Sequence, residues 1–264
     1  NVGIGHQSLN KNTLSHYNTA VGYQTLENNT GASNTALGHM TMNANTTGKE
    51  NVGVGDLALR YNTTGDGNVG LGHRALYTNI GGSNNTAVGY YALNSNTTGT
   101  HNVGIGYQAL MTNSTGNSNV AVGKEAMYSN TLGLNNVAVG NEPLRSNTIG
   151  EGNVALGLQA LYSNVNGNNN FALGNNALYS NAGGHGNVAI GYRSLRLTTG
   201  SGNVGIGSEA LTTNTTGTTN TAIGNYADVS TGNLTNATAI GAGAIVNASN
   251  KVRIGNSSVL VIEG

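Results

Sequence analysis

The chain of 264 residues has no cysteine and no tryptophan, one proline and one phenylalanine, and only 8% charged residues. The lack of cysteine excludes a disulfide framework and cysteine-based zinc sites. Basic and acidic side chains balance at 10 each, so the chain lacks the basic surface typical of nucleic-acid binders and the polybasic signal for anionic membranes. No apolar run approaches the ~18 residues of a membrane-spanning helix. We therefore expect no nucleic-acid partner and no membrane insertion.

Glycine is abundant, with 42 residues, and the block Asn-Val/Thr-Gly/Ala-aliphatic-Gly recurs along the chain. Successive blocks lie 17 residues apart, or 16 in two cases, and degenerate copies follow at Ala237 and Lys251. The usual helical repeats have units of about 33 residues or more. The period instead predicts an all-β parallel β-roll or β-solenoid of 16–17-residue coils, each with two short strands and two turns. We expect a repeat domain over residues 1–236 and terminal coils over residues 237–264. The regular blocks begin at Asn1, Asn18, Asn34, Asn51, Asn68, Asn85, Asn102, Asn119, Asn136, Asn153, Asn170, Asn187, Asn203 and Asn220.

Each coil is numbered here from its leading Asn as position 1. Side chains alternate along a strand, so positions 2 and 4 share one face and position 3 points to the other. Position 4 is always aliphatic, and position 9 is Leu in most coils, which predicts that these two positions form the core. The Gly or Ala at position 3 would then face outward and allow close contact between chains. The predicted core is Ile4, Val21, Leu37, Val54, Leu71, Val88, Ile105, Val122, Val139, Leu156, Leu173, Ile190, Ile206 and Ile223 at position 4, with Leu9, Leu26, Leu59, Leu76, Leu93 and Leu110 at position 9.

Asparagine recurs at positions 1 and 12, and glycine occupies position 5 of every coil. Stacked Asn amides can donate and accept along a column, and Asn also tolerates left-handed turn backbone. The Gly indicates a conformation or a close approach that a Cβ atom would forbid. The predicted column at position 12 contains Asn12, Asn29, Asn45, Asn62, Asn79, Asn96, Asn113 and Asn130.

The blocks Asn18–Gly22, Asn85–Gly89 and Asn187–Gly191 resemble the head repeat of YadA-like trimeric autotransporter adhesins and related tail-fibre proteins. The resemblance implies a left-handed roll, three chains side by side, and an extracellular, cell-surface or virion location. The longer coils favour the tail-fibre branch. The segment Asn250–Gly264 resembles the sequence before a self-cleaving intramolecular chaperone domain, which implies trimer assembly and a C-terminal region beyond this sequence.

Position 6 offers a candidate binding stripe, because His and Tyr recur there. The same position also accepts Asp56, Lys124 and Asn141, as a solvated corner would, so both interpretations stay open. The dinucleotide fingerprint at Gly53–Ala58 is part of the repeating coil, and the chain has too few Asp residues for a calcium-binding roll. We expect no cofactor and no metal. The candidate stripe contains His6, Tyr23, His39, His73, Tyr90 and Tyr107.

These patterns favour a structural fibre or shaft segment, with adhesion along its side as a further role, over an enzyme. Neither paired carboxylates nor a nucleophile beside a base stand out, so no catalytic residue is predicted. The alternative is an adhesin module that binds a glycan or ice with one regular face. A glycan would use the His/Tyr stripe, whereas ice would use the Thr residues at position 13, a column that Ile80, Val165 and Ala182 interrupt.

Overall fold

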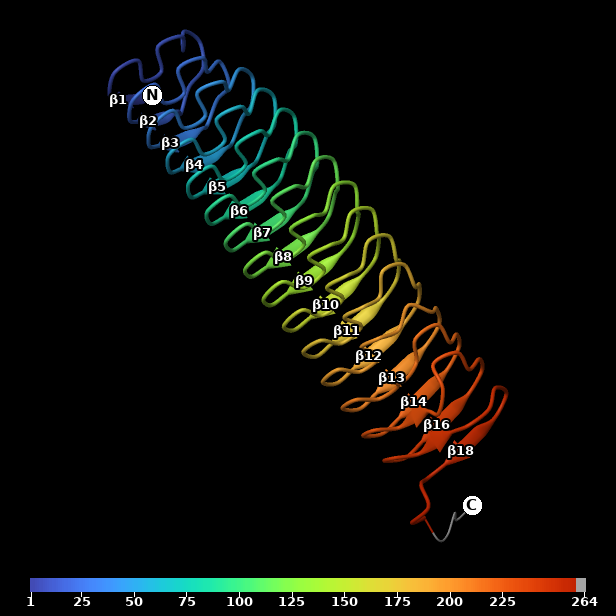
Figure 1. The fold of residues 1–264 in the computed structure, drawn as a ribbon. Coiled ribbons are helices and arrows are strands. Elements are labelled where there is room, and N and C mark those ends of the chain that lie inside the picture. Colours follow the sequence, from blue (N-terminus) through green and yellow to red (C-terminus); the bar gives the residue numbers. More distant parts are fainter. Residues whose placement is uncertain (260–264) are drawn as a thin grey trace. The chain divides into compact units, whose positions relative to one another are not determined.

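The computed structural model describes residues 1–259 and divides the chain into two compact units, residues 1–135 and 136–264. Both units are parallel β-solenoids, which confirms the predicted fold class (Figure 1). The residues Leu260–Gly264, within the predicted terminal coils and the chaperone-like segment, lie outside the described residues. The predicted boundary at residue 236 stays a prediction.

Unit 1 stacks one three-residue strand from each coil, and neighbouring strands pair in parallel with identical coil positions opposite each other. Its strands are β1 (Val2–Ile4), β2 (Thr19–Val21), β3 (Thr35–Leu37), β4 (Val52–Val54), β5 (Val69–Leu71), β6 (Thr86–Val88), β7 (Val103–Ile105) and β8 (Val120–Val122).

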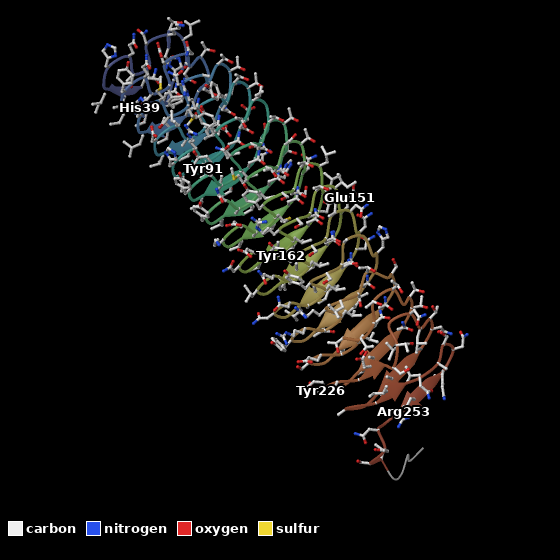
Figure 2. The ribbon with its side chains drawn as sticks, in the orientation of Figure 1. His39, Tyr91, Glu151, Tyr162, Tyr226 and Arg253 are labelled. Carbon is white, nitrogen blue, oxygen red and sulfur yellow. The ribbon has the colours of Figure 1, made fainter. Side chains whose placement is uncertain are left out.

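Unit 2 repeats this arrangement and adds a second, two-stranded ladder near its C-terminal end. Its main sheet contains β9 (Val137–Val139), β10 (Val154–Leu156), β11 (Phe171–Leu173), β12 (Val188–Ile190), β13 (Val204–Ile206), β14 (Thr221–Ile223), β16 (Thr238–Ile240) and β18 (Val252–Ile254). The second ladder pairs β15 (Asp228–Val229) with β17 (Ile245–Val246). Arg253 in β18 takes position 3 of the last coil, where other coils have Gly or Ala (Figure 2).

Two strands per coil were expected, but most coils have one. After the strand, the chain runs through residues in the left-handed region: Gln108 at position 7 has a φ of 55° and Leu110 at position 9 a φ of 51°. Hydrogen bonds between coils continue there, as from the Leu93 amide to the Ala109 carbonyl at 2.9 Å. Neighbouring coils are therefore joined by backbone hydrogen bonds here, although the backbone is not in the extended conformation of a strand.

The core of each unit is built from positions 3, 8 and 9. In coil Asn85, Ala87, Ala92 and Leu93 are all fully buried. A Cβ atom on Gly104, at position 3 of the next coil, would lie 3.2 Å from the Leu93 Cγ atom. The small residues of one coil therefore pack on the large residue of its neighbour. The predicted Leu26, Leu59, Leu76, Leu93 and Leu110 are fully buried, and Leu9, in the first described coil, is half-buried.

The predicted core role of position 4 is wrong, and so is the outward orientation of position 3. Ile105 at position 4 is 38% exposed and Leu37 is 49% exposed, whereas the adjacent Ala36 at position 3 is buried. A coil this narrow has room for one large side chain, and Leu at position 9 takes it. The position 4 residues that lie on the outer face are Ile4, Val21, Leu37, Val54, Leu71, Val88, Ile105, Val122, Val139, Leu156, Leu173, Ile190, Ile206 and Ile223.

Asparagine ladders flank this core in both units. At position 12, Asn79 Nδ2 donates to Asn62 Oδ1 at 2.6 Å and to the Gly82 carbonyl at 2.8 Å, while its own Oδ1 accepts from Asn96 Nδ2 at 2.7 Å. The Asn residues at position 1 form a parallel ladder; for example, Asn85 Oδ1 accepts from the Asn102 backbone amide at 3.0 Å. From Asn29 onward the predicted column is fully buried, and Asn12 is half-buried.

Asp228 replaces the position 9 Leu in coil Asn220, and its side chain is half-buried and hydrogen-bonded. Its Oδ1 accepts from the Val229 amide at 2.8 Å and its Oδ2 from Thr212 Oγ1 at 3.2 Å. Burial nevertheless dominates and raises the pKa of Asp228 above its ordinary value. The buried place is taken by Val229, which is 2% exposed.

We expect Asp228 to make the fold more stable as the pH is lowered. Because its folded-state pKa is raised, the folded chain binds more protons than the unfolded chain between the ordinary carboxyl pKa of ~3.9 and the folded value. Thermal midpoints of the parent chain and of Asp228→Asn, measured across acidic pH, test this. The parent midpoint minus the variant midpoint should increase as the pH falls through this interval. A flat or decreasing difference would contradict the raised pKa.

Candidate functional site

The six residues of the predicted His/Tyr stripe lie in one column of unit 1, at the corner after each strand. His6 stacks on Tyr23 with ring centroids 5.3 Å apart, and Tyr23 stacks on His39 at 5.6 Å. Tyr90 stacks in the same way on Tyr107 at 5.6 Å and on His73 at 5.2 Å. The sequence therefore located one column that contains two stacks of three rings.

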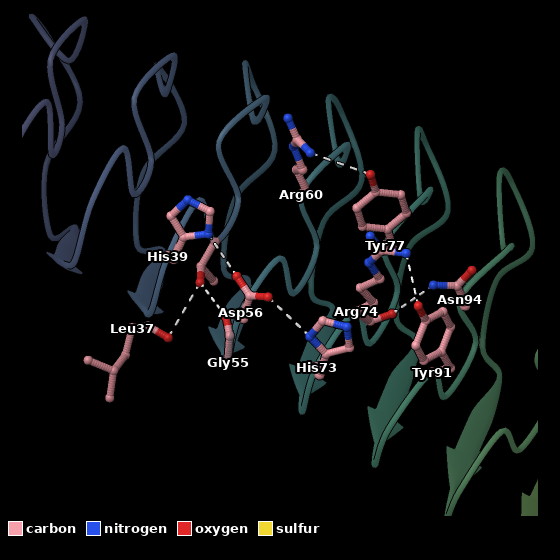
Figure 3. Close-up of polar contacts among 11 residues, drawn as sticks. Leu37, His39, Gly55, Asp56, Arg60, His73, Arg74, Tyr77, Tyr91 and Asn94 are labelled. Atoms are coloured by element: carbon pink, nitrogen blue, oxygen red, sulfur yellow. Dashed lines mark hydrogen bonds and ion pairs between the residues drawn. The ribbon is translucent and has the colours of Figure 1, made fainter.

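Asp56 joins the two halves of this column (Figure 3). Its Oδ1 lies 2.8 Å from His39 Nδ1, and its Oδ2 lies 3.1 Å from His73 Nδ1. A carboxylate can only accept, so the His39 imidazole carries a hydrogen at Nδ1 and donates it to Asp56, while His73 Nδ1 lies at ion-pair distance from the other carboxylate oxygen. The side chains of His39 and Asp56 are about half exposed, at 52% and 46%. Asp56 is therefore the one residue at position 6 between His6 and Tyr107 that is neither His nor Tyr, and it links the two ring stacks.

The stacking limits what this column can bind. A sugar ring packs on the face of an aromatic ring, but both faces of Tyr23 and of Tyr90 are already covered by neighbouring rings. Burial, followed by the adjacent Tyr91, raises the pKa of Tyr90, so the phenol stays neutral at physiological pH. The column presents ring edges and hydroxyl groups, which suits hydrogen bonding better than sugar stacking.

The largest regular surface feature is an aliphatic stripe, defined as the outward side chains at positions 2 and 4. Strand β7 shows the pattern: Val103 and Ile105 face outward, while Gly104 between them is buried. The stripe contains no charged residue in either unit. In unit 1 it consists of Val2, Ile4, Thr19, Val21, Thr35, Leu37, Val52, Val54, Val69, Leu71, Thr86, Val88, Val103, Ile105, Val120 and Val122. In unit 2 it consists of Val137, Val139, Val154, Leu156, Phe171, Leu173, Val188, Ile190, Val204, Ile206, Thr221, Ile223, Thr238, Ile240, Val252 and Ile254.

A second cluster, which the sequence did not single out, combines arginine with tyrosine at positions 7, 10 and 11 of unit 1. We define the Arg–Tyr cluster as Arg60, Tyr61, Arg74, Tyr77 and Tyr91. Figure 3 shows Arg60, Arg74, Tyr77 and Tyr91. Arg74 Nη1 donates to the Tyr91 hydroxyl at 2.9 Å, and its guanidinium lies 5.1 Å from the Tyr77 ring centroid. The available signal was the tyrosine at position 10, but the arginines come from two different positions of adjacent coils.

The position 13 threonines use their hydroxyl hydrogens within the stack. Thr46 Oγ1 donates to the Thr63 carbonyl at 2.8 Å, and Thr63 Oγ1 donates to the Ile80 carbonyl at 2.9 Å. Thr97 Oγ1 repeats the contact with the Ser114 carbonyl at 3.0 Å. These donors are committed to neighbouring coils and are unavailable to an ice lattice, so this column does not favour ice binding.

Within residues 1–259 we find no cleft or enclosed cavity and no group of three metal-ligating side chains. No helix in that range is long and apolar enough to cross a membrane. The described surface therefore offers faces rather than a hollow, and its chemistry is concentrated in the aliphatic stripe, the His/Tyr column and the Arg–Tyr cluster.

No protein-family model matches this sequence, and no curated protein is significantly similar to it.

Proposed function

We propose that this chain is a structural shaft segment that associates with two further copies of itself through the aliphatic stripe. The observation that carries the proposal is the stripe, because it is uncharged, regular and half exposed in both units. The fully buried Asn, Ala, Leu and Gly positions maintain the stack itself. The stripe is the feature that stacking leaves unexplained.

The chemistry of the stripe favours another copy as its occupant. Ile105 is 38% exposed and Leu173 41% exposed, and covering the remaining exposed part of each such side chain would contribute about 1 kcal/mol. A second stripe repeats at the same strand spacing of ~4.8 Å, so two copies match coil for coil. Scattered apolar residues are normal on a surface, but contiguous ones indicate an interaction site.

The number of copies, the left-handed winding and the setting come from the resemblance to YadA-like head repeats and tail-fibre proteins. We propose three chains side by side in an appendage of a cell surface or a virion, outside the cell. The shaft would project and space a tip, with no catalytic role. Correcting the contact face from position 3 to positions 2 and 4 keeps this assembly physically reasonable, because position 3 is buried within each chain.

Charges placed in the stripe should separate the copies. We expect Val103→Asp combined with Ile105→Asp to convert the assembly to single chains of 26.7 kDa at about micromolar concentration, because uncompensated carboxylates in an apolar contact cost several kcal/mol each. Both residues lie outside the core, so the variant should fold. Sedimentation velocity gives the mass, and circular dichroism checks the fold.

The matched control is Thr98→Asp combined with Thr115→Asp, which adds the same charge to exposed turn residues of unit 1. The control should sediment like the parent chain. A parent assembly that survives the stripe substitutions intact would contradict the proposed contact. Equal dissociation by both pairs would point to net charge rather than to the stripe.

A further inference from the structure

The Arg–Tyr cluster of unit 1 holds two guanidinium groups without carboxylate partners. None of the described residues places a carboxylate within 4.0 Å of Arg60 or Arg74. The nearby Asp56 is already shared between His39 and His73. Both arginines are half-buried. Their positive charges therefore remain available to a ligand.

Tyrosine side chains hold both guanidiniums in place. Arg60 lies 5.0 Å from the Tyr61 ring centroid and its Nη1 approaches the Tyr77 hydroxyl at 3.4 Å. Arg74 lies over the rings of Tyr77 and Tyr91, at 5.1 Å and 5.6 Å. Cation–π contacts and phenol hydrogen bonds restrict these long side chains before any ligand arrives, which lowers the ordering cost of binding.

Most donors of these groups are unused. A guanidinium has five N–H donors, and Arg74 gives one to Tyr91 and Arg60 one, weakly, to Tyr77. The Nε atoms of Arg60 and Arg74 are buried and have no hydrogen-bond partner among the described residues, so an external ligand would use the Nη donors. The planar donor fork of arginine fits oxyanions in bidentate geometry, so the unused donors define the ligand chemistry.

The two arginines lie in adjacent coils, Arg60 at position 10 of one and Arg74 at position 7 of the next. Adjacent coils are separated by ~4.8 Å and both guanidiniums contact the same Tyr77, so the two charges form a close pair across neighbouring coils. A linear polymer with closely spaced acidic groups can engage both members of such a pair at once, which a single small ion does less well. Nucleic acid is a poorer fit, because the chain has zero net charge and offers only two free cations here.

We propose that Arg60 and Arg74 form a binding site for the carboxylate or sulfate groups of an acidic polysaccharide, oriented by Tyr61, Tyr77 and Tyr91. The site lies at positions 7, 10 and 11, apart from the aliphatic stripe at positions 2 and 4, so the inference does not depend on the proposed self-association. It assigns the adhesive role to a surface other than the His/Tyr column.

Binding of defined polymers to the assembled full chain tests this site. The probes are polygalacturonate and dextran sulfate, with neutral dextran as the uncharged comparison. We expect both acidic polymers to bind and neutral dextran not to bind. Arg60→Gln combined with Arg74→Gln should weaken binding roughly tenfold or more, as expected for the loss of hydrogen bonds to charged groups. Arg60→Lys combined with Arg74→Lys should recover only part of the affinity, because lysine keeps the charge but loses the fork.

The matched control is Lys11→Gln combined with Lys49→Gln, which removes the same charge from exposed residues of unit 1 and should leave binding within about twofold of the parent. Competition by inorganic sulfate or monomeric galacturonate at equal charge concentration would support the oxyanion site but assign it to a free anion. The proposal is overturned by unchanged binding in the Arg→Gln pair, by equal loss in the lysine control, by equal binding of neutral dextran, by no binding of either acidic polymer, or by preferred binding of duplex DNA. Unchanged circular dichroism and unchanged sedimentation of the variants keep this result separate from the proposed self-association.

Discussion

Replacing Gly106 by alanine is expected to destabilise the folded chain by about 3 kcal/mol or more. Gly106 at position 5 has a φ of 132°, a conformation that costs an L-residue of order 1–3 kcal/mol. A Cβ atom there would also lie 2.5 Å from the Gly123 carbonyl oxygen of the next coil. Since that oxygen is part of the backbone, the coils must move apart. Urea denaturation gives the change in the free energy of unfolding.

The control for this prediction lies two residues earlier, inside strand β7. Gly104 at position 3 has ordinary backbone, and its Cβ atom would meet Leu93 Cγ at 3.2 Å and the Ala109 carbonyl oxygen at 3.3 Å. Other coils already have Ala at this position, such as Ala87 and Ala121. We expect Gly104→Ala to change stability by less than ~1 kcal/mol. Similar costs at the two sites would show that position 5 does not need glycine for the reasons given.

Replacing Asn79 by aspartate is expected to lower the free energy of unfolding by about 3–5 kcal/mol at neutral pH. This is the range found when a buried charge has no partner. The substitution keeps the shape but removes two donors. The new carboxylate would face Asn62 Oδ1 and the Gly82 carbonyl, which now accept from Asn79 Nδ2 at 2.6 Å and 2.8 Å. Stability should partly recover as the pH falls toward the ordinary Asp range of ~4, because a protonated carboxyl can donate one of these bonds again.

Asn84→Asp is the matched control, since Asn84 is exposed at position 17 and lies outside both Asn ladders. Denaturation of the two variants at neutral and acidic pH compares the same chemical change in buried and exposed settings. The exposed variant should differ from the parent by less than ~0.5 kcal/mol. If Asn79→Asp is equally mild, the ladder is not a source of stability.

The period, the parallel stack and the residues of the Asn columns could be predicted from the sequence because each depends on repetition. Each feature recurs in almost every coil, so many copies of the repeat support the same assignment. The requirement for Gly at position 5 was visible for the same reason. Its geometric cause, the carbonyl of the next coil, needed the structure.

The orientation of the strand could not be predicted from alternation alone. Alternation separates Val103 and Ile105 from Gly104, but it does not say which set is inside. The ordinary rule that large apolar side chains are buried favoured Ile105. The rule failed because the coil is too narrow for two large side chains, and Leu110 already fills it. The aliphatic residues left outside then became the main candidate for a contact between chains.

The Arg–Tyr cluster was missed for a different reason. Arg60 lies at position 10 of one coil and Arg74 at position 7 of the next, so no single column of the repeat contains both. Their proximity depends on left-handed residues after the strand, such as Arg74 with a φ of 54° and Leu76 with 52°. That backbone was not evident in a segment whose sequence indicated a second strand.

The mass of the parent chain in solution tests the central claim, that the aliphatic stripe is covered by other copies, most directly. Sedimentation equilibrium over a range of concentrations gives this mass without reference to shape. The account predicts three times the 26.7 kDa of one chain. A mass of 26.7 kDa for a folded chain at tens of micromolar would contradict it, because the stripe would then be exposed to water with nothing to cover it.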